Sequence, residues 1–551
     1  MNWTSLISDN PFYEFTLILA LAALLGAIGQ LLKQPLIVMF IVLGILAGPS
    51  VLDIVKSKDN FNLLAEVGIS MLLFIVGLKL DLRIIKSVGK IALMTGLGQV
   101  LFTSLIGYSI GLALGFSSLY SFYIAVALTF SSTIIIVKLL SDKKEIDSLH
   151  GQIAIGFLIV QDILVILVMI VISALGDSGK LSLATNIISI LISGAALLAF
   201  ALIAMKWIIP GIIAFLARSR ELLTLFAIAW AVSLATIGEF TGFSGAVGAF
   251  LAGVSLASSD FKDVISSRLT SLRDFLLLFF FVNLGADIDL SDLGSQVFPA
   301  LIFSAFVLIG NPIIVLIIMG IMGYRKRTSF LAGLTVAQIS EFSLIFAGLG
   351  LAVGHITEEV VGLITLVGLI TIGLSTYLIL YSHQIYEFLS PALGIFQRKI
   401  PFRENAIKSV KIKKYELIII GMGRFGTRLS EMLDEHPEIN YLGIDFDPSV
   451  IKRYRLKGKD IVYGDIEDPE LLGHIPFQDT KLIISTVPDY RLSKQLTKAL
   501  KRENYTGKVY LTALNDKEYQ SLSFTGAEQV LRPQQMAATN FYNSYVKEML
   551  L

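Results

Sequence analysis

The stretch Ile155-Gly-Phe-Leu-Ile-Val-Gln161-Asp162-Ile-Leu-Val-Ile166 is apolar except for an amide and a carboxyl group at its centre. It belongs to the apolar run 151–176. That run can cross a bilayer, because a spanning helix needs about 20 mostly apolar residues. A carboxylate in the middle of such a helix costs ~2.5–3.5 kcal/mol on insertion scales, so it normally marks a transport pathway or a partner. The stretch therefore predicts a membrane protein with a polar site at mid-depth.

Apolar runs fill most of the chain. Of its 551 residues, 55% are hydrophobic and 16% are charged, and the mean hydropathy is +0.76. The excess lies in residues 11–382, whereas 398–551 has the composition of a soluble domain. The chain therefore holds a helical membrane domain followed by a soluble one. The candidate spans, about thirteen by length and hydropathy, are 13–32, 35–52, 61–80, 89–115, 119–140, 151–176, 183–208, 219–237, 242–258, 271–286, 298–322, 328–352 and 357–382.

Loop charges orient these spans. Cytoplasmic loops carry the Lys and Arg excess of a membrane protein, and here the basic residues gather in every second loop. The intervening loops hold only Lys56, Lys58 and Lys180. An odd number of spans then predicts an outside N-terminus and a cytoplasmic C-terminal domain. No cleaved leader is expected, because no Lys or Arg precedes the first apolar run. The basic residues of the alternate loops are Lys33, Lys79, Arg83, Lys86, Lys90, Lys143, Lys144, Arg218, Arg220, Lys262, Arg268, Arg273, Arg325, Lys326 and Arg327.

Composition also excludes several classes of function. The 44 basic and 43 acidic residues nearly cancel, so nothing predicts nucleic-acid binding. There is no cysteine, which excludes disulfides, thiolate metal sites and cysteine nucleophiles. The five histidines form no evident cluster, and no catalytic constellation accompanies them. We therefore expect a protein that is not an enzyme.

The fifth and twelfth spans, seven apart, carry polar residues near their centres: Thr129-Phe-Ser-Ser-Thr133 and Gln338-Ile-Ser-Glu341. This relation suggests inverted repeats, the common build of secondary transporters. Hydroxyl groups can satisfy backbone carbonyls where a helix breaks, and freed carbonyls can coordinate a cation. Hydroxyls that only hold helices together are the alternative. The candidate ligands are Thr129, Ser131, Ser132 and Thr133, with Glu341 offsetting a half-helix dipole or carrying a second proton.

Asp162 is the candidate carrier of the transported species. A carboxyl group in hydrocarbon can hold either a proton or a small cation, and competition for one site is enough to couple the two fluxes. The alternative is a buried Asp that caps a neighbouring helix. The tenth span, 271–286, has no central Lys or Arg that could neutralise Asp162.

The soluble part carries a glycine-rich turn after an apolar strand, in Tyr415-Glu-Leu-Ile-Ile-Ile-Gly421-Met-Gly423-Arg-Phe-Gly426. Asp445 ends a second strand about 20 residues later, where an acid that binds ribose belongs. Strand signals at 461–463, 481–486 and 509–513 alternate with helical stretches. This pattern predicts a doubly wound α/β sheet that binds a nucleotide. Its predicted contacts are Gly421, Gly423, Arg424, Phe425, Gly426, Asp445 and Asp465, and a fold without a ligand is the alternative.

In order along the chain, these segments resemble the Kef family of bacterial potassium/proton antiporters, within the cation:proton antiporter-2 group. The resemblance rests on 66–81, 128–133, Gln161-Asp162, 242–253, 338–342, 421–426 and Gly464-Asp465. It implies two crossed, broken helices at spans five and twelve, elevator-like transport, and a homodimer in a bacterial inner membrane. The pair Gln161-Asp162 is similar to that of potassium-selective members, which implies K⁺ and H⁺ at Asp162. The lack of a Lys or Arg in the tenth span that could pair with Asp162 resembles the pattern of electroneutral exchangers.

The resemblance further implies that the soluble part is a KTN/RCK domain that binds AMP or NAD(H). Arg424 matches a basic residue of the family's ligand site, but the segment 509–516 lacks the arginines that Kef proteins carry there, so glutathione gating is not expected. Domain boundaries are predicted at 1–382 (membrane), 383–414 (basic linker, suited to anionic lipid), 415–535 (nucleotide-binding domain) and 536–551 (tail). The alternatives are a Na⁺/H⁺ antiporter of the same fold, an RCK-gated cation channel and a membrane-anchored nicotinamide enzyme.

Overall fold

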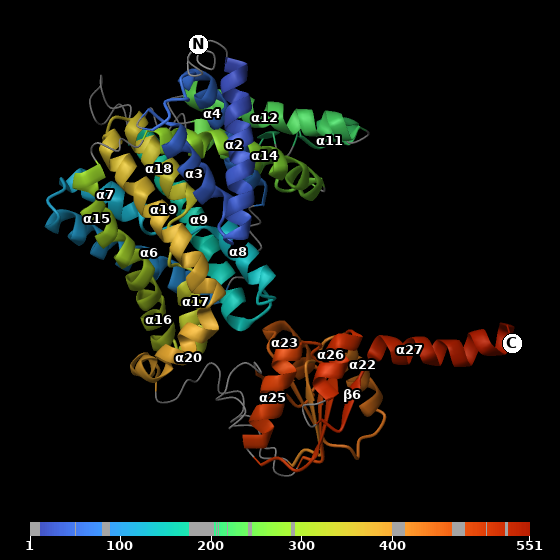
Figure 1. Ribbon diagram of the computed structural model, residues 1–551. Helices are drawn as coiled ribbons and strands as arrows, with labels where there is room; N and C mark the ends of the chain where they lie inside the picture. The colour runs from blue at the N-terminus through green and yellow to red at the C-terminus, as the bar shows by residue number, and fades with distance from the viewer. Residues whose placement is uncertain are drawn as a thin grey trace. The chain divides into compact units, whose positions relative to one another are not determined.

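The computed structural model forms two compact units (Figure 1). The first is helical and comprises 1–143, 153–319 and 329–391, and the second comprises 144–152, 320–328 and 392–551 and contains the β-sheet. The residues that the structure describes are 11–49, 51–79, 89–175, 203–204, 207, 209–216, 219–240, 245–259, 261–287, 293–398, 414–464, 480–502, 504–523 and 527–550.

Eight helices among the described residues are long and apolar enough to cross a membrane, and four shorter apolar helices accompany them. A multi-span helical domain is thus confirmed. The predicted span 183–208 lies almost wholly outside the described residues. The helices are α2 (Pro11–Leu31), α3 (Leu36–Ala47), α4 (Lys58–Lys79), α6 (Gly89–Ala113), α7 (Ser118–Ala127), α8 (Thr133–Asp142), α9 (Leu149–Leu175), α11 (Ile209–Leu216), α12 (Arg220–Phe240), α13 (Gly245–Leu256), α14 (Lys262–Ala286), α15 (Leu293–Ala305), η2 (Phe306–Gly310), α16 (Asn311–Ile321), α17 (Lys326–Leu334), α18 (Glu341–Ala352), α19 (Glu358–Leu380) and α20 (Ser382–Leu393).

Two of the predicted spans are broken helices, as expected from their polar centres. The fifth span is divided into α7 and α8 by the non-helical residues 128–132, and the twelfth into α17 and α18 by 335–340. Serine caps the second half in both cases: Ser132 accepts from the Ile135 N–H at 3.3 Å, and Ser340 from the Phe342 N–H at 3.1 Å. Because an N-cap serine satisfies an orphan N–H group at a helix start, these residues favour a new helix within each span.

By their contacts, the helices pack in two groups. One group contains α3, α4, α12, α13 and α14, where glycines bring backbones into contact. A Cβ at Gly253 would lie 2.0 Å from the Phe74 carbonyl oxygen, and one at Gly285 would lie 2.3 Å from the Ile41 carbonyl oxygen. Small residues permit such close approach between membrane helices. The other group contains both broken helices with α6, α9, α15, α16 and α19; hydrogen bonds link α8 to Asp162 of α9, α9 to α6, and α16 to both breaks. One core of buried apolar side chains, with members from both groups, lies between them.

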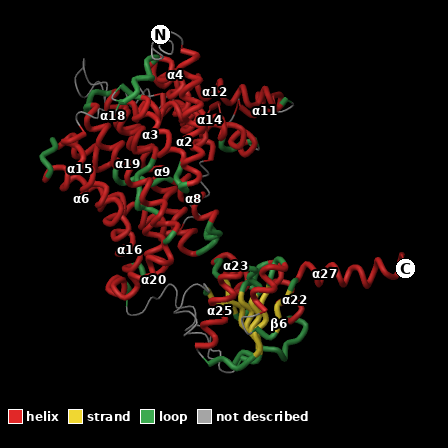
Figure 2. The backbone as a smooth tube through the Cα atoms, viewed as in Figure 1, coloured by secondary structure: helices red, strands yellow, loops and turns green. Residues whose placement is uncertain are grey.

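The second unit contains a six-stranded parallel sheet in the order β3-β2-β1-β4-β5-β6 (Figure 2). Its order reverses beside β1, as in a doubly wound nucleotide-binding fold, so the α/β class is confirmed. The strand β6 was not expected from sequence. The elements are β1 (Leu417–Ile420), α22 (Arg424–Leu433), β2 (Tyr441–Asp445), α23 (Pro448–Leu456), β3 (Ile461–Tyr463), β4 (Leu482–Ser485), α25 (Tyr490–Arg502), β5 (Lys508–Thr512), α26 (Asp516–Ser523), β6 (Gln529–Leu531), α27 (Pro533–Phe541), η4 (Tyr542–Val546) and α28 (Lys547–Leu550).

The segment predicted as a C-terminal tail is helical. Residues 533–550 form α27, η4 and α28, which project from the sheet (Figure 1). Phe541, Tyr545 and Met549 recur every four residues and are exposed by 60%, 59% and 81%. Residues four apart share a helix face, so this arm presents an uncovered apolar stripe.

Candidate functional site

Asp162 lies in the middle of α9 and is half-buried. Its Oδ2 accepts a hydrogen bond of 2.8 Å from the Thr133 hydroxyl, at the first residue of α8. The structure therefore brings the predicted carrier to the first break, although the two residues are 29 positions apart. A charge-assisted hydrogen bond of this kind favours the ionised carboxylate.

The four hydroxyls at this break have different surroundings. Thr129 donates to the Val126 carbonyl at 2.7 Å, which completes the end of α7, while Ser132 caps α8. Thr133 is bonded to Asp162. The Ser131 hydroxyl is buried and has no hydrogen-bond partner among the described residues. A buried hydroxyl without a partner is costly, so Ser131 is the hydroxyl of this group that is free to bind a ligand.

Gln161 points to the same break. Its Oε1 accepts from the Ser131 N–H at 3.2 Å, and its Nε2 donates to Gln99 Oε1 in α6 at 2.7 Å. Both glutamines are fully buried. Sequence reasoning missed Gln99, together with Thr103 and Asn311, to which it is linked. The sequence did contain a signal for these residues: Gln99 and Thr103 are polar residues four apart in an apolar helix, and Asn311 interrupts an apolar run.

At the second break, Gln338 and Glu341 are buried. Gln338 Oε1 accepts from the Ser375 hydroxyl at 2.6 Å, and its Nε2 has no partner among the described residues. Glu341 is the first residue of α18 and accepts from the Ser340 hydroxyl at 3.4 Å. A carboxylate at a helix N-terminus offsets the helix dipole, which fits one of the two roles considered for Glu341.

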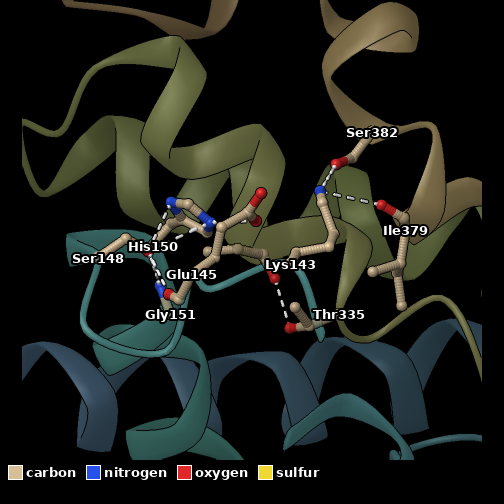
Figure 3. A network of polar contacts seen from close by, with 9 residues as sticks. Lys143, Glu145, Ser148, His150, Gly151, Thr335, Ile379 and Ser382 are labelled. Atoms are coloured by element: carbon tan, nitrogen blue, oxygen red, sulfur yellow. Dashed lines mark hydrogen bonds and ion pairs between the residues drawn. The ribbon is translucent and has the colours of Figure 1, made fainter. Parts of the chain in front are cut away.

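Figure 3 shows further polar contacts, some within the first unit and some within the second. Lys143 Nζ donates to the Ser382 hydroxyl at 2.7 Å and to the Ile379 carbonyl at 3.2 Å, which fastens α8 to the end of α19. Within the second unit, His150 at the start of α9 contacts the Glu145 carboxylate of the preceding loop at 3.0 Å. Charged residues at the ends of spans suggest solvated side chains, which is why sequence reasoning gave these residues no specific contacts.

The glycine turn of the soluble unit has the geometry that its motif predicts. Gly421 has φ of +91°, which favours glycine. A Cβ at Gly426 would lie 2.1 Å from the Gly421 carbonyl oxygen, so α22 packs directly against the end of β1. Gly423 caps α22, and no atom of the residues that the structure describes lies within 4 Å of its Cβ position. The helix N-terminus is thus open to an anion.

Asp445 ends β2 beside this turn. Its Oδ2 accepts from the Met422 N–H at 2.6 Å and its Oδ1 from the Asp447 N–H at 2.9 Å. Burial raises the pKa of Asp445 above its ordinary value, while these backbone bonds act in the opposite direction. The other predicted acid, Asp465, lies outside the described residues.

A cavity of about 830 Å³ opens beside the turn, on the side of β4 and β5. Arg424, Arg428 and Arg532 line it. Arg532 is paired with Asp516 and lies 4.3 Å over the Tyr519 ring. Sequence reasoning found Arg424 but missed Arg428 and Arg532. The start of α27, where Arg532 lies, is brought to the same cavity as α22 only by the order of the strands in the folded sheet.

A multi-span helical domain with a carboxylate at a broken helix, joined to a nucleotide-binding type of α/β domain, defines an ion-coupled secondary transporter. The chain belongs to the sodium/hydrogen exchanger family: the model described as "Sodium/hydrogen exchanger, transmembrane" matches residues 17–380, and the TrkA-N domain matches 417–533. It is a cation/proton antiporter of the cation:proton antiporter-2 group with a C-terminal TrkA-N (KTN) domain, and not an enzyme.

The relatives agree with this assignment. "Putative cation/proton antiporter YbaL" of Escherichia coli (strain K12) is 28% identical over 526 residues, which are 93% of either chain. "K(+)/H(+) antiporter subunit KhtU" of Bacillus subtilis (strain 168) is 30% identical over 63% of this chain and 87% of that one. The solved sodium proton antiporter MjNhaP1 of Methanocaldococcus jannaschii matches 70% of this chain and 97% of its own, with a TM-score of 0.50 and 19% identity, and supports the fold alone.

Proposed function

We propose that this antiporter exchanges K⁺ for H⁺ at Asp162. The observation that carries the proposal is the pairing of this carboxylate with Thr133, two residues after Ser131, whose buried hydroxyl has no partner in the described part of the chain. A proton neutralises the carboxylate, and a cation replaces that proton only if further oxygens substitute for its water shell. Ser131 and Thr133 supply such oxygens. Because one carboxylate cannot bind both species, each ion leaves before the other binds.

Potassium is the proposed cation for two reasons. The relative KhtU is named a K(+)/H(+) antiporter subunit, and the pair Gln161-Asp162 resembles that of potassium-selective Kef proteins. Sodium is the second candidate, since the chain belongs to the sodium/hydrogen exchanger family. Gln161 limits the set of ligands for either cation, because its Oε1 already accepts a hydrogen bond from the Ser131 N–H and is not available to the ion. The oxygens left for the ion are those of Asp162, Ser131 and Thr133.

We further propose an elevator mechanism. The helix group that holds both breaks and Asp162 would move as one body past the group of α3, α4, α12, α13 and α14. Glycine-mediated backbone contacts support a rigid second group, and interfaces between packed bodies that slide are a common form of alternating access. We also propose that the protein lies in a bacterial inner membrane and that its C-terminal unit is in the cytoplasm.

The soluble unit is proposed to bind an adenine nucleotide as a regulatory ligand. The open N-terminus of α22 suits its phosphates and Asp445 its ribose. The proposed homodimer would cover the apolar stripe of Phe541, Tyr545 and Met549, and the basic linker suits anionic lipid.

Everted membrane vesicles test the proposal. A pH gradient is established and KCl, NaCl or RbCl is added; K⁺ should dissipate the gradient more strongly than Na⁺. The substitution Asp162→Asn should abolish the response, whereas Asp142→Asn, at the end of α8, should leave it near the parental level. Parental exchange by Asp162→Asn would remove Asp162 from the mechanism, and a larger response to Na⁺ would favour the second candidate.

A further inference from the structure

A continuous chain of hydrogen bonds runs from the first break to the second through three helices. Gln161 Nε2 donates to Gln99 Oε1 at 2.7 Å, and Gln99 Nε2 donates to Thr103 Oγ1 at 3.1 Å. The Thr103 hydroxyl donates to Asn311 Oδ1 at 2.8 Å. Asn311 Nδ2 then donates to the carbonyls of Leu128 at 3.2 Å and Val336 at 3.5 Å. All four side chains, Gln99, Thr103, Gln161 and Asn311, are fully buried.

The two ends of this chain fix its direction. At one end the Ser131 N–H can only donate, so it must face Gln161 Oε1 and not Nε2. At the other end the carbonyls of Leu128 and Val336 can only accept, so they must face Asn311 Nδ2. Proceeding from either end gives the same orientation of every amide and hydroxyl between them. The network is therefore satisfied in one arrangement, and a fully satisfied buried network holds its members rigidly.

Asn311 is the residue that joins the two breaks. It is the first residue of α16 and contacts a carbonyl in each unwound segment, 183 and 25 positions away. Only an amide can do this, because the position needs an acceptor for Thr103 and donors for two carbonyls. An Asp would present oxygen to oxygen, and a Leu would remove the bond that the Thr103 hydroxyl donates and the bonds that the two carbonyls accept.

We infer that Asn311, Thr103 and Gln99 are positioning residues for cation binding. They hold both breaks together and keep Gln161 on the Ser131 backbone, and thereby fix the Ser131 hydroxyl and Asp162 at the spacing that a cation requires. This inference rests on the proposed function of Asp162. Without the network the Asp162 carboxylate remains, but the hydroxyl oxygens beside it shift. The affinity for the cation then falls, and the difference in affinity between cations becomes smaller. Proton binding is unaffected, because a proton needs no such set of oxygens.

Thr103 provides the test, because Val has the same shape without the hydroxyl and Ser keeps the hydroxyl. In proteoliposomes of the full chain, Thr103→Val should raise the KM for K⁺ about tenfold at fixed pH, as expected when buried partners lose their bond, with little change in Vmax. Thr103→Ser should stay near the parental KM. Thr103→Val should also narrow the ratio of the KM values for Na⁺ and K⁺. Adding Asn311→Leu also removes both bonds to the breaks and should raise the KM further, by less than the sum of the two single effects, since residues of one network are not additive.

A parental KM in Thr103→Val, or reduced Vmax with unchanged KM and ion ratio, would overturn the inference and leave a structural role only. If Thr103→Val does not fold, Gln99→Met replaces it. The K⁺-dependent rise in unfolding temperature then gives an affinity without turnover, and an unchanged K⁺ midpoint would contradict the inference. The Asp162→Asn variant separates the two claims: exchange by that variant refutes the proposed function, whereas an inactive Asp162→Asn beside a parental Thr103→Val refutes the network alone.

Discussion

Replacing Thr133 with Val removes the hydroxyl that donates to Asp162 Oδ2 at 2.8 Å and keeps the shape of the side chain. Hydrogen bonds to charged groups contribute about 1.5–3 kcal/mol, and each 1.4 kcal/mol is a factor of ten in an equilibrium constant. The bond stabilises the carboxylate that the cation binds and not the protonated acid. Thr133→Val should therefore raise the apparent KM for the cation at fixed pH by about 10- to 100-fold, with Vmax little changed.

The assay is cation-dependent proton flux in proteoliposomes across a range of pH. Because the proton competes with the cation, part of the defect of Thr133→Val should be recovered as the pH is raised. Thr133→Ser, which keeps the hydroxyl, is the matched control and should remain close to the parental KM. The argument is refuted if Thr133→Val has the parental KM at every pH, or if Thr133→Ser is as impaired as Thr133→Val.

Two further substitutions probe the soluble unit. Asp445→Ala should weaken adenine-nucleotide binding about tenfold or more in calorimetry, because the ribose loses its acceptor and the Met422 N–H its partner; unchanged affinity, or equal weakening by Glu435→Ala, would contradict this. Phe541→Glu should lower the fraction of dimer in light scattering of the detergent-solubilised chain, because it places a charge in an apolar stripe; a dimer as stable as the parental one would show that this stripe is not the interface.

The sequence was sufficient for features that depend on local chemistry. Long apolar runs predicted the spans, because a bilayer imposes a fixed length. Thr129–Thr133 and Gln338–Glu341 predicted the two breaks, since hydroxyl and amide side chains near mid-membrane favour interrupted helices. The spacing of Gly421, Gly423, Gly426 and Asp445 predicted the parallel sheet and its turn. In each case a short segment contained its own evidence.

Features that depend on distant contacts could not be predicted. Asn311 and Thr103 lie 208 positions apart, and nothing in either helix alone shows that they meet. The four hydroxyls of the first break looked equivalent in sequence, and only their partners separate Ser131 from Thr129 and Ser132. In the soluble unit, β6 has only three residues, and the helical arm after it has a mixed aromatic and polar composition that resembles a tail.

The central claim is that a proton and a cation compete for the single carboxyl group of Asp162. The measurement that tests it most directly is the apparent KM for K⁺ of the parental antiporter as a function of pH in proteoliposomes. One shared site predicts that the KM rises towards tenfold for each unit of acidification while Vmax at saturating K⁺ stays constant. A KM that does not change with pH, or one that changes equally in Asp162→Asn, would contradict the account.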